Sequence, residues 1–157
     1  YAGGVIDWDN GMASHKGVDE VDSGLYNKIT ETDFATGATM MIKVEVFKKI
    51  GNFDEKFFLY LEDLDFSLRA KKAGFSILYV PKAIAWHKWA RATGGGSALQ
   101  DYYFTRNRLL FGLKYTSFRA KFALIRESFK FLMKNGVKRQ AVLDFYLGRF
   151  GKGSFKA

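Results

Sequence analysis

The spacing of hydrophobic and polar positions predicts both helices and strands in the first part of the chain. One helix is predicted over residues 45–50, ended by Gly51, and a second over residues 60–73, followed by Gly74. Residues 1–33, rich in Gly, Asp, Asn and Ser, are expected to form loop with a short strand or hairpin. Short apolar runs predict strands at Thr39–Lys43, Phe75–Val80 and Ile84–Trp86. This mixture indicates an α/β or α+β sheet domain.

The last third of the chain has a helical pattern. The run Thr93-Gly94-Gly95-Gly96-Ser97 is the expected flexible joint. Between Phe118 and Lys134, one helical face collects the apolar side chains of Phe118, Phe122, Ile125, Phe129, Leu132 and Met133. The neighbouring face collects Arg119, Arg126, Lys130 and Lys134, so this is an amphipathic basic helix. A further helix is expected over 138–147 and a frayed tail over 148–157. The predicted domains are residues 1–92 and 93–157.

Composition narrows the possible classes of protein. The 157 residues suffice for about one ordinary domain, and 48% hydrophobic residues can form a core. The absence of cysteine excludes disulfide scaffolds, zinc–thiolate sites and thiol catalysis, and fits a reducing compartment. We expect no secretion signal and no membrane span, because the first residues lack a basic and apolar leader and no apolar run reaches about 20 residues.

The net charge of +9 is unevenly distributed. Residues 1–87 hold 10 Lys and Arg against 13 Asp and Glu, whereas residues 88–157 hold 15 against 3. A basic surface attracts phosphate groups on nucleic acids, nucleotides or anionic lipids, and charge alone does not choose among them.

An acidic and aromatic stretch over residues 53–69 holds the first candidates for chemistry. On a helix, Glu62, Asp65 and Arg69 share one face, and Asp65 and Arg69 form an i, i+4 ion pair. Asp63 points elsewhere and has no obvious internal partner. An unpaired carboxylate beside aromatic side chains can act as a general base, although acidic residues also simply favour a helix N-terminus.

Two histidines and two arginines are further candidates. His87 follows a predicted strand, where it can bind a metal, transfer protons or be structural. His15 lies in the polar leader and is expected to be solvated. Arg106 and Arg108 lie among aromatic residues and either clamp a diphosphate or sugar or form the solvated face of a helix.

Several spaced motifs, in order along the chain, carry a resemblance to a known family. They are Asp33-Phe34-x-x-Gly37-Ala38; Val46-Phe47-x-x-Ile50-Gly51-x-Phe53-Asp54-Glu55; Phe57-Phe58-x-Tyr60-x-Glu62-Asp63-x-Asp65-Phe66-x-x-Arg69; Gly74-Phe75; Tyr79-Val80-Pro81; Trp86-His87; and Tyr103-x-x-Arg106-Asn107-Arg108. From about Gly3 to Tyr115 the chain resembles the C-terminal half of the family-2 glycosyltransferases. The likeness is to the rhamnosyltransferase-like branch that builds bacterial and archaeal surface polysaccharides.

The resemblance implies a fold, a reaction and a set of site residues. The fold is α/β, a partial GT-A domain over residues 1–92 followed by a basic α-helical tail over residues 93–157. The reaction is the inverting transfer of a sugar from a nucleotide donor to the hydroxyl of a glycan or lipid-linked acceptor. By this likeness Asp63 is the base, and His87 helps to hold Mg²⁺ or Mn²⁺ on the donor diphosphate. The implied substrate-binding residues are Gly37, Ala38, Glu62, Asp65, Arg69, Arg106 and Arg108.

One departure from the family pattern changes the expectation for activity. Only about 30 residues precede Asp33, so the nucleotide-binding half and its Asp-x-Asp motif are absent from this sequence. Asp7-Trp8-Asp9 matches the Asp-x-Asp pattern, but no nucleotide-binding strands precede it. We therefore expect an acceptor-side half with little or no activity alone, so that whether the chain is itself an enzyme stays open. Apolar surface left uncovered is expected to be buried in a homodimer or by a separate nucleotide-binding chain.

A different class of function rests on the basic helix over residues 118–134. The chain can instead be a non-catalytic module that binds a membrane surface or a partner through this helix, or the helix can be a plain tail that packs on its own core. Both interpretations fit a cytoplasmic protein held at the inner face of the membrane. Nucleic-acid binding is not expected, because no motif that reads single strands or duplexes is present.

Overall fold

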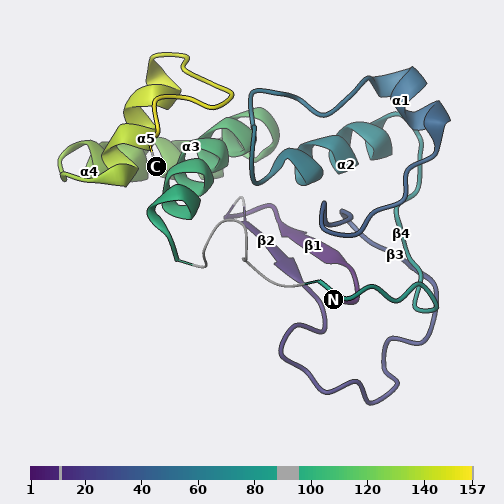
Figure 1. The fold of residues 1–157 in the computed structure, drawn as a ribbon. Coiled ribbons are helices and arrows are strands. Elements are labelled where there is room, and N and C mark those ends of the chain that lie inside the picture. The colour runs from purple at the N-terminus through teal and green to yellow at the C-terminus, as the bar shows by residue number, and fades with distance from the viewer. Residues whose placement is uncertain (11, 88–95, 157) are drawn as a thin grey trace. The chain divides into compact units, whose positions relative to one another are not determined.

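The computed structural model describes residues 1–10, 12–87 and 96–156, and Figure 1 labels its elements. The chain forms two compact units. The first unit comprises Tyr1–Asp7, Met12–Phe53 and Asp63–His87. The second unit comprises residues 8–10, Asp54–Glu62 and residues 96–156 of the described chain. The expected domain boundary between residues 92 and 93 lies outside the described residues, as does most of the expected glycine joint, so both stay predictions.

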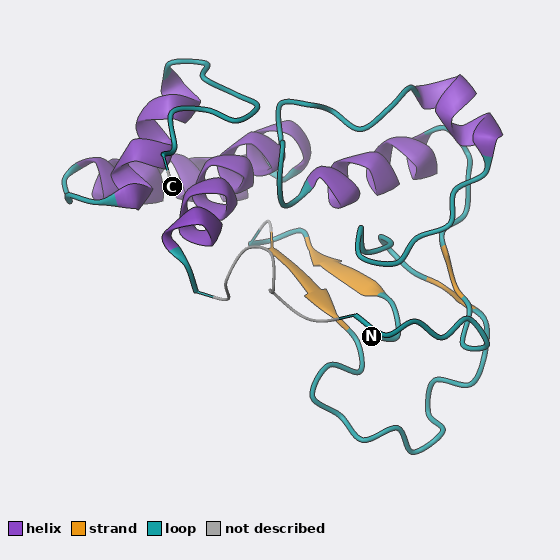
Figure 2. Ribbon diagram, viewed as in Figure 1, coloured by secondary structure: helices purple, strands orange, loops and turns teal. Residues whose placement is uncertain are grey.

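The first unit contains two small antiparallel sheets (Figure 2). Strands β1 (Gly4–Asp7) and β2 (Met12–His15) pair so that Gly4 lies opposite His15. Strands β3 (Thr30–Glu31) and β4 (Leu78–Tyr79) pair with Thr30 opposite Tyr79. The hairpin expected within residues 1–33 is therefore confirmed. Because a two-stranded sheet alone is marginally stable, side-chain contacts must hold these strands in place.

Two helices supply the core of the first unit. Helix α1 (Val44–Ile50) ends at Gly51, whose N–H donates the last helical bond to the Phe47 carbonyl oxygen and whose positive φ of 76° turns the following chain out of the helix. Helix α2 (Glu62–Lys72) packs Phe66 and Ala70 against Val46 of α1. Both helices were predicted, although α2 begins two residues later than expected.

Three strand predictions are wrong or only partly right. Residues 39–43 and 84–86 form no strand, and Met41, Ile84 and Trp86 are almost fully exposed. Of the strand predicted over 75–80, only Leu78–Tyr79 is formed. A strand needs a neighbouring backbone to satisfy its hydrogen bonds, and in the described part of the chain no strand runs beside these residues. Five helices and two small sheets in the described residues confirm a mixed α/β fold, consistent with part of a GT-A domain.

Three helices form most of the second unit. They are α3 (Ala98–Tyr115), α4 (Phe118–Leu132) and α5 (Val137–Tyr146), which pack against one another. Ser97 and Ser117 cap α3 and α4, each accepting a hydrogen bond from a backbone N–H three residues later. None of the helices in the described residues has the length and hydropathy needed to cross a bilayer. The predicted helices are present. The expectation that they form a separate basic tail stays a prediction.

The expectation of a frayed C-terminus is wrong for residues 148–156. The backbone N–H and the hydroxyl of Ser154 both donate to Asp144 Oδ2, at 2.8 and 2.6 Å. The Phe155 ring lies 5.2 Å from the ring of Tyr102, centroid to centroid. Burial raises the pKa of Asp144, but the hydrogen bonds from Ser154 and Tyr102 outweigh it, so the net pKa lies below its usual value. A satisfied buried carboxylate thus anchors the last residues, a contact that local composition does not reveal.

Candidate functional site

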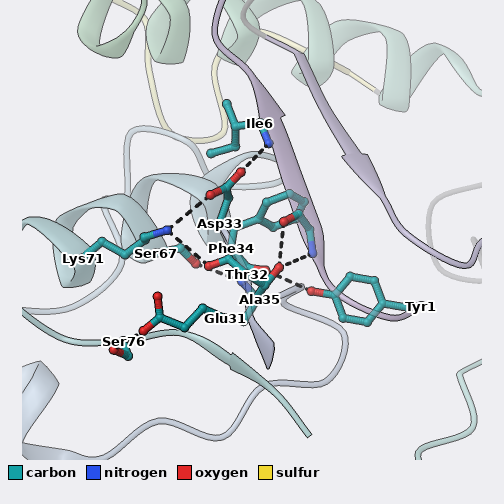
Figure 3. Close-up of polar contacts among 11 residues, drawn as sticks. Tyr1, Ile6, Glu31, Thr32, Asp33, Phe34, Ala35, Ser67, Lys71 and Ser76 are labelled. Carbon is teal, nitrogen blue, oxygen red and sulfur yellow. Dashed lines mark hydrogen bonds and ion pairs between the residues drawn. The ribbon is translucent and has the colours of Figure 1, made fainter. Parts of the chain in front are cut away.

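The segment Glu31–Ala35 joins the N-terminal hairpin to the rest of the first unit (Figure 3). The Thr32 hydroxyl accepts a hydrogen bond from the Gly4 N–H at 2.6 Å and donates to the Gly4 carbonyl oxygen at 2.7 Å. Asp33 Oδ2 accepts a hydrogen bond from the Ile6 N–H at 3.0 Å. The segment therefore continues the hydrogen bonding of β1 through side chains.

The same segment is bonded to helix α2. Lys71 Nζ lies 3.3 Å from both Asp33 Oδ1 and the Thr32 carbonyl oxygen. The Ala35 N–H donates to the buried Ser67 hydroxyl at 3.2 Å. These bonds fix where the chain emerges from the segment, so the following turn lies beside the first turn of α2.

The carboxylate of Asp63 lies at this junction. Its Oδ2 accepts a hydrogen bond from the Gly37 N–H at 2.8 Å, and its Oδ1 accepts one from the Leu64 N–H at 2.9 Å. Within the described part of the chain, no Lys or Arg forms an ion pair with it. Each carboxylate oxygen still has a second lone pair, so the oriented group can accept a proton or a further hydrogen bond. Two residues named together by the resemblance, Gly37 and Asp63, are thus in direct contact.

Sequence reasoning missed the neighbours of Asp63 on the hairpin. The His15 ring lies between the rings of Tyr1 and Phe34, with centroid distances of 5.0 and 5.2 Å, while part of the side chain stays exposed. Burial lowers the pKa of His15, and the negative charge of Asp63 offsets this only in part. The imidazole is therefore mostly neutral at pH 7. No local signal identifies His15, because its place depends on the register of β1 and β2.

Asp65 and Arg69 stabilise the base of the site. The predicted i, i+4 pair is confirmed, with Arg69 Nε 2.8 Å from Oδ2 of the fully buried Asp65. The two terminal nitrogens of Arg69 donate to the carbonyl oxygens of Ile50 and Asn52, each at 2.9 Å. Arg69 therefore ties α2 to the end of α1, and a direct contact of this pair with substrate stays a prediction.

Replacing Arg69 by lysine is expected to destabilise the protein by about 1–3 kcal/mol although the charge is kept. The flat guanidinium reaches three acceptors at once, whereas an ammonium group cannot span them and weakens the contacts to the buried Asp65 carboxylate and to the carbonyl oxygens of Ile50 and Asn52. Urea unfolding of Arg69→Lys measures the loss. Lys72→Arg, the reverse exchange at an exposed site on the same helix, is the control and should change little. Equal stability of Arg69→Lys and the wild type would contradict this role.

In the second unit, Arg106 and Asn107 are fully buried and hold the loop over residues 56–60. Arg106 Nη2 donates to the carbonyl oxygens of Lys56 and Phe57, at 3.2 and 3.1 Å. The Asn107 amide nitrogen lies 2.7–2.8 Å from the carbonyl oxygens of Phe57, Leu59 and Tyr60. In this structure both side chains serve the fold, and a contact of Arg106 with a diphosphate stays a prediction.

These bonds explain why α2 begins at Glu62. Phe58, Tyr60 and Leu61 have φ angles of 61°, 67° and 68°, a left-handed conformation that costs non-glycine residues free energy. The helical pattern read from residue 60 onwards therefore could not continue upstream of Glu62. The amide of Asn107 offsets this cost by satisfying the carbonyl groups that the twisted loop exposes.

Removing that amide should have a clear effect on stability. Asn107→Ala leaves the carbonyl oxygens of Leu59 and Tyr60 in a strained loop without this donor, while Phe57 keeps the bond from Arg106, so we expect a loss of about 2–4 kcal/mol. Chemical denaturation followed by circular dichroism measures it. Asn135→Ala, the same exchange at an exposed position, should stay within about 0.5 kcal/mol of wild type. A small effect at both positions would show that the loop does not depend on Asn107.

The other predicted site residues are less involved in contacts. Ala38 and His87 are exposed, and Glu62 is half-buried at the first residue of α2. Arg108 Nη1 forms an ion pair with Glu127 at 2.8 Å, within the second unit. The structure does not bring His87 into a hydrogen bond or ion pair with any described residue. The roles predicted for these side chains in substrate or metal binding stay predictions.

The described residues do not make a Mg²⁺ or Mn²⁺ site by themselves. Nowhere among them do three or more His, Cys, Asp or Glu side chains gather as metal ligands. Magnesium and manganese require several oxygen ligands, and one exposed imidazole does not supply them.

Comparison with curated proteins finds three kinds of relative. Over 59 residues the chain is 39% identical to the N-acetylglucosaminyl-diphospho-decaprenol L-rhamnosyltransferase of Mycobacterium tuberculosis, covering 38% of this chain and 19% of the relative. It is 36% identical over 58 residues to the rhamnosyltransferase WbbL of Escherichia coli, covering 37% and 22%. It is 34% identical over 88 residues to the low-salt glycan biosynthesis hexosyltransferase Agl10 of Haloferax volcanii, covering 55% and 29%.

These matches set the extent of the relationship. The chain spans less than a third of the length of each of these relatives. No solved structure gives a significant match. The model of one family, described as glycosyltransferase like family 2, matches residues 15–108, which is more than half of the chain and includes Gly37, Asp63 and Arg106. The chain therefore belongs to the glycosyltransferase like family 2.

Proposed function

We propose that this chain supplies the acceptor side of an inverting glycosyltransferase, with Asp63 as the general base. The observation that carries the proposal is the setting of the Asp63 carboxylate. Two backbone N–H groups orient it, no ion pair within the described residues neutralises it, and it remains partly exposed. Membership of the family supports sugar transfer as the reaction.

The proposed reaction moves one proton and exchanges one bond. Asp63 takes the proton of an acceptor hydroxyl while that oxygen forms a bond to the anomeric carbon of the donor sugar. Attack comes from the face opposite the nucleoside diphosphate, whose oxygen leaves with the electron pair of the broken C–O bond. Configuration at the anomeric carbon is thereby inverted. The N–H groups of Gly37 and Leu64 hold the carboxylate in one orientation, which limits the entropy lost in reaching the transition state.

Neighbouring carboxylates are poorer candidates for the base. Asp65 is fully buried and its Oδ2 is held by Arg69, so an acceptor hydroxyl cannot reach it. Asp33 is bonded on one side to β1 and on the other to Lys71. Both residues shape the site, whereas Asp63 is free to exchange a proton with a ligand.

The names of the relatives suggest the class of acceptor. One acts on N-acetylglucosaminyl-diphospho-decaprenol, and another takes part in glycan biosynthesis. By analogy we propose a glycan or lipid-linked acceptor and a nucleotide-sugar donor. Binding of the donor nucleotide and its Mg²⁺ or Mn²⁺ is assigned to a nucleotide-binding segment outside these 157 residues, to which His87 adds one imidazole. The isolated chain is expected to transfer little or no sugar.

A chimaeric enzyme tests the proposal. The whole chain, residues 1–157, replaces the corresponding segment of the rhamnosyltransferase WbbL, whose remaining part supplies the donor side. We expect the chimaera to transfer rhamnose to the acceptor of that enzyme, and the isolated chain not to. A folded chimaera that still binds the donor nucleotide but transfers no sugar would count against an acceptor-side role.

A further inference from the structure

Helix α4 turns an apolar stripe away from the core of its own unit. We call Phe118, Phe122, Phe129 and Met133 the α4 stripe; their side chains are 87%, 64%, 56% and 90% exposed. The face of α4 that packs inward carries Ala120, Leu124 and Ser128, all nearly fully buried. The Phe129 ring still contacts the Tyr146 ring of α5, with 6.4 Å between centroids, whereas Phe118, Phe122 and Met133 are too exposed to hold α4 on the helices of its unit.

Basic side chains flank the α4 stripe. At 3.6 residues per turn, Arg119, Arg126 and Lys130 lie along one side of it, and all three are exposed. Glu127 is the single acidic residue of the α4 sequence, and its charge is compensated by Arg108 at 2.8 Å. The surface around the stripe is therefore positive, with large apolar groups at its centre.

We propose that this face of α4 docks on an anionic lipid surface, with the helix lying in the plane of the interface. Apolar side chains enter the boundary of the acyl chains while the cations meet lipid phosphates, and the two contributions add. A single-stranded nucleic acid would meet the cations and could stack bases on the rings of Phe118 and Phe122, but it offers no apolar phase for Met133. The helix has 15 residues, about 22 Å at 1.5 Å per residue, so it is too short to span a bilayer.

The structure also presents this face in a folded form. Ser117 caps the start of α4, and Leu124 packs in one cluster with Leu109 of α3 and Val142 of α5. The helix therefore need not form on the membrane, which removes the ordering cost that disordered amphipathic segments incur. This inference does not depend on the proposed role of Asp63.

Vesicle flotation tests the proposal with the whole chain. Wild type should float with vesicles that contain phosphatidylglycerol and much less with phosphatidylcholine alone. Each cation near an anionic surface contributes roughly fivefold to binding, so Arg119→Gln with Arg126→Gln and Lys130→Gln should weaken it roughly a hundredfold. The matched control removes three exposed lysines of the first unit, Lys28→Gln, Lys48→Gln and Lys72→Gln, and should have a far smaller effect.

A fluorescent label tests whether the α4 stripe enters the lipid, in variants that change only one side chain. Because the chain has no cysteine, Phe129→Cys and Ala123→Cys each give one site for an environment-sensitive dye. Residue 123 is exposed on the polar side of the same helix. With anionic vesicles the dye at 129 should shift to the blue and brighten, and the dye at 123 should change little.

Three results would overturn the proposal. The first is absence of binding to anionic vesicles, and the second is equal responses of the dyes at 129 and 123. The third is a wild-type dimer in light scattering that becomes monomeric in Phe122→Ser with Phe129→Ser while vesicles are not bound. In that case the α4 stripe is an interface between copies of the chain.

Discussion

Asp63→Asn is expected to lower the rate of sugar transfer by the chimaera about 10²- to 10⁴-fold, the usual contribution of a general base. The asparagine amide can still accept the hydrogen bond of the Gly37 N–H through its oxygen, so the fold should be kept. It cannot take a proton from the acceptor. The loss should therefore appear in kcat, with little change in the KM for the acceptor.

A matched substitution separates loss of the base from loss of charge. Asp22 is exposed and accepts a hydrogen bond from the Gly24 N–H, which asparagine can also accept. Asp22→Asn should leave the rate within about twofold of the parent chimaera. If Asp63→Asn also kept most of the rate, the base would have to be sought elsewhere.

Gly153→Ala is expected to destabilise the protein by about 3–5 kcal/mol. Gly153 has a φ of 63°, which disfavours alanine, and a β-carbon there would overlap the Tyr102 hydroxyl. It would also lie 2.7 Å from Arg106 Nη1 and 3.2 Å from Asp144 Oδ2. These side chains are fully buried and hydrogen-bonded, so they cannot move aside without losing partners.

Gly148→Ala is the control that separates the cost of the positive φ from the cost of steric overlap at Gly153. Gly148 has nearly the same φ, 67°, but a β-carbon there meets no atom within 4 Å. We expect a loss of about 1–2 kcal/mol from the backbone alone. The difference between the two variants in urea unfolding measures the crowding at Gly153. Equal losses would mean that the packing around Asp144 relaxes easily.

Local signals in the sequence predict the helices well. Gly51 stops α1, and the charges and spacing of residues 62–69 predict both α2 and the pair of Asp65 with Arg69. These features depend only on residues within one or two helical turns of each other. The strands predicted at 39–43 and 84–86 fail, because a strand depends on a partner that the local pattern cannot supply.

In the candidate site too, the sequence predicts what depends on local signals and misses what depends on contacts between distant residues. The resemblance named Gly37 and Asp63, and the structure adds that the backbone of one bonds the carboxylate of the other. Arg106 was interpreted either as a clamp for a diphosphate or sugar or as part of a solvated helix face, whereas it is fully buried against the loop of Lys56 and Phe57, about fifty residues earlier. His15 was assigned to solvent, and its ring contacts depend on the hairpin register. Contacts between distant residues decide these cases, and one sequence does not contain them.

The bonds of Asn107 to the loop before α2 have a consequence for how the protein is made. The carbonyl oxygen of Phe57 lies fifty positions upstream of the amide that binds it. On the ribosome, the left-handed turns at Phe58, Tyr60 and Leu61 must wait for α3 to emerge before they gain that support. The residues directly ahead of Asp63 should therefore stay open to proteases in nascent chains that stop short of Asn107, and become protected in longer ones.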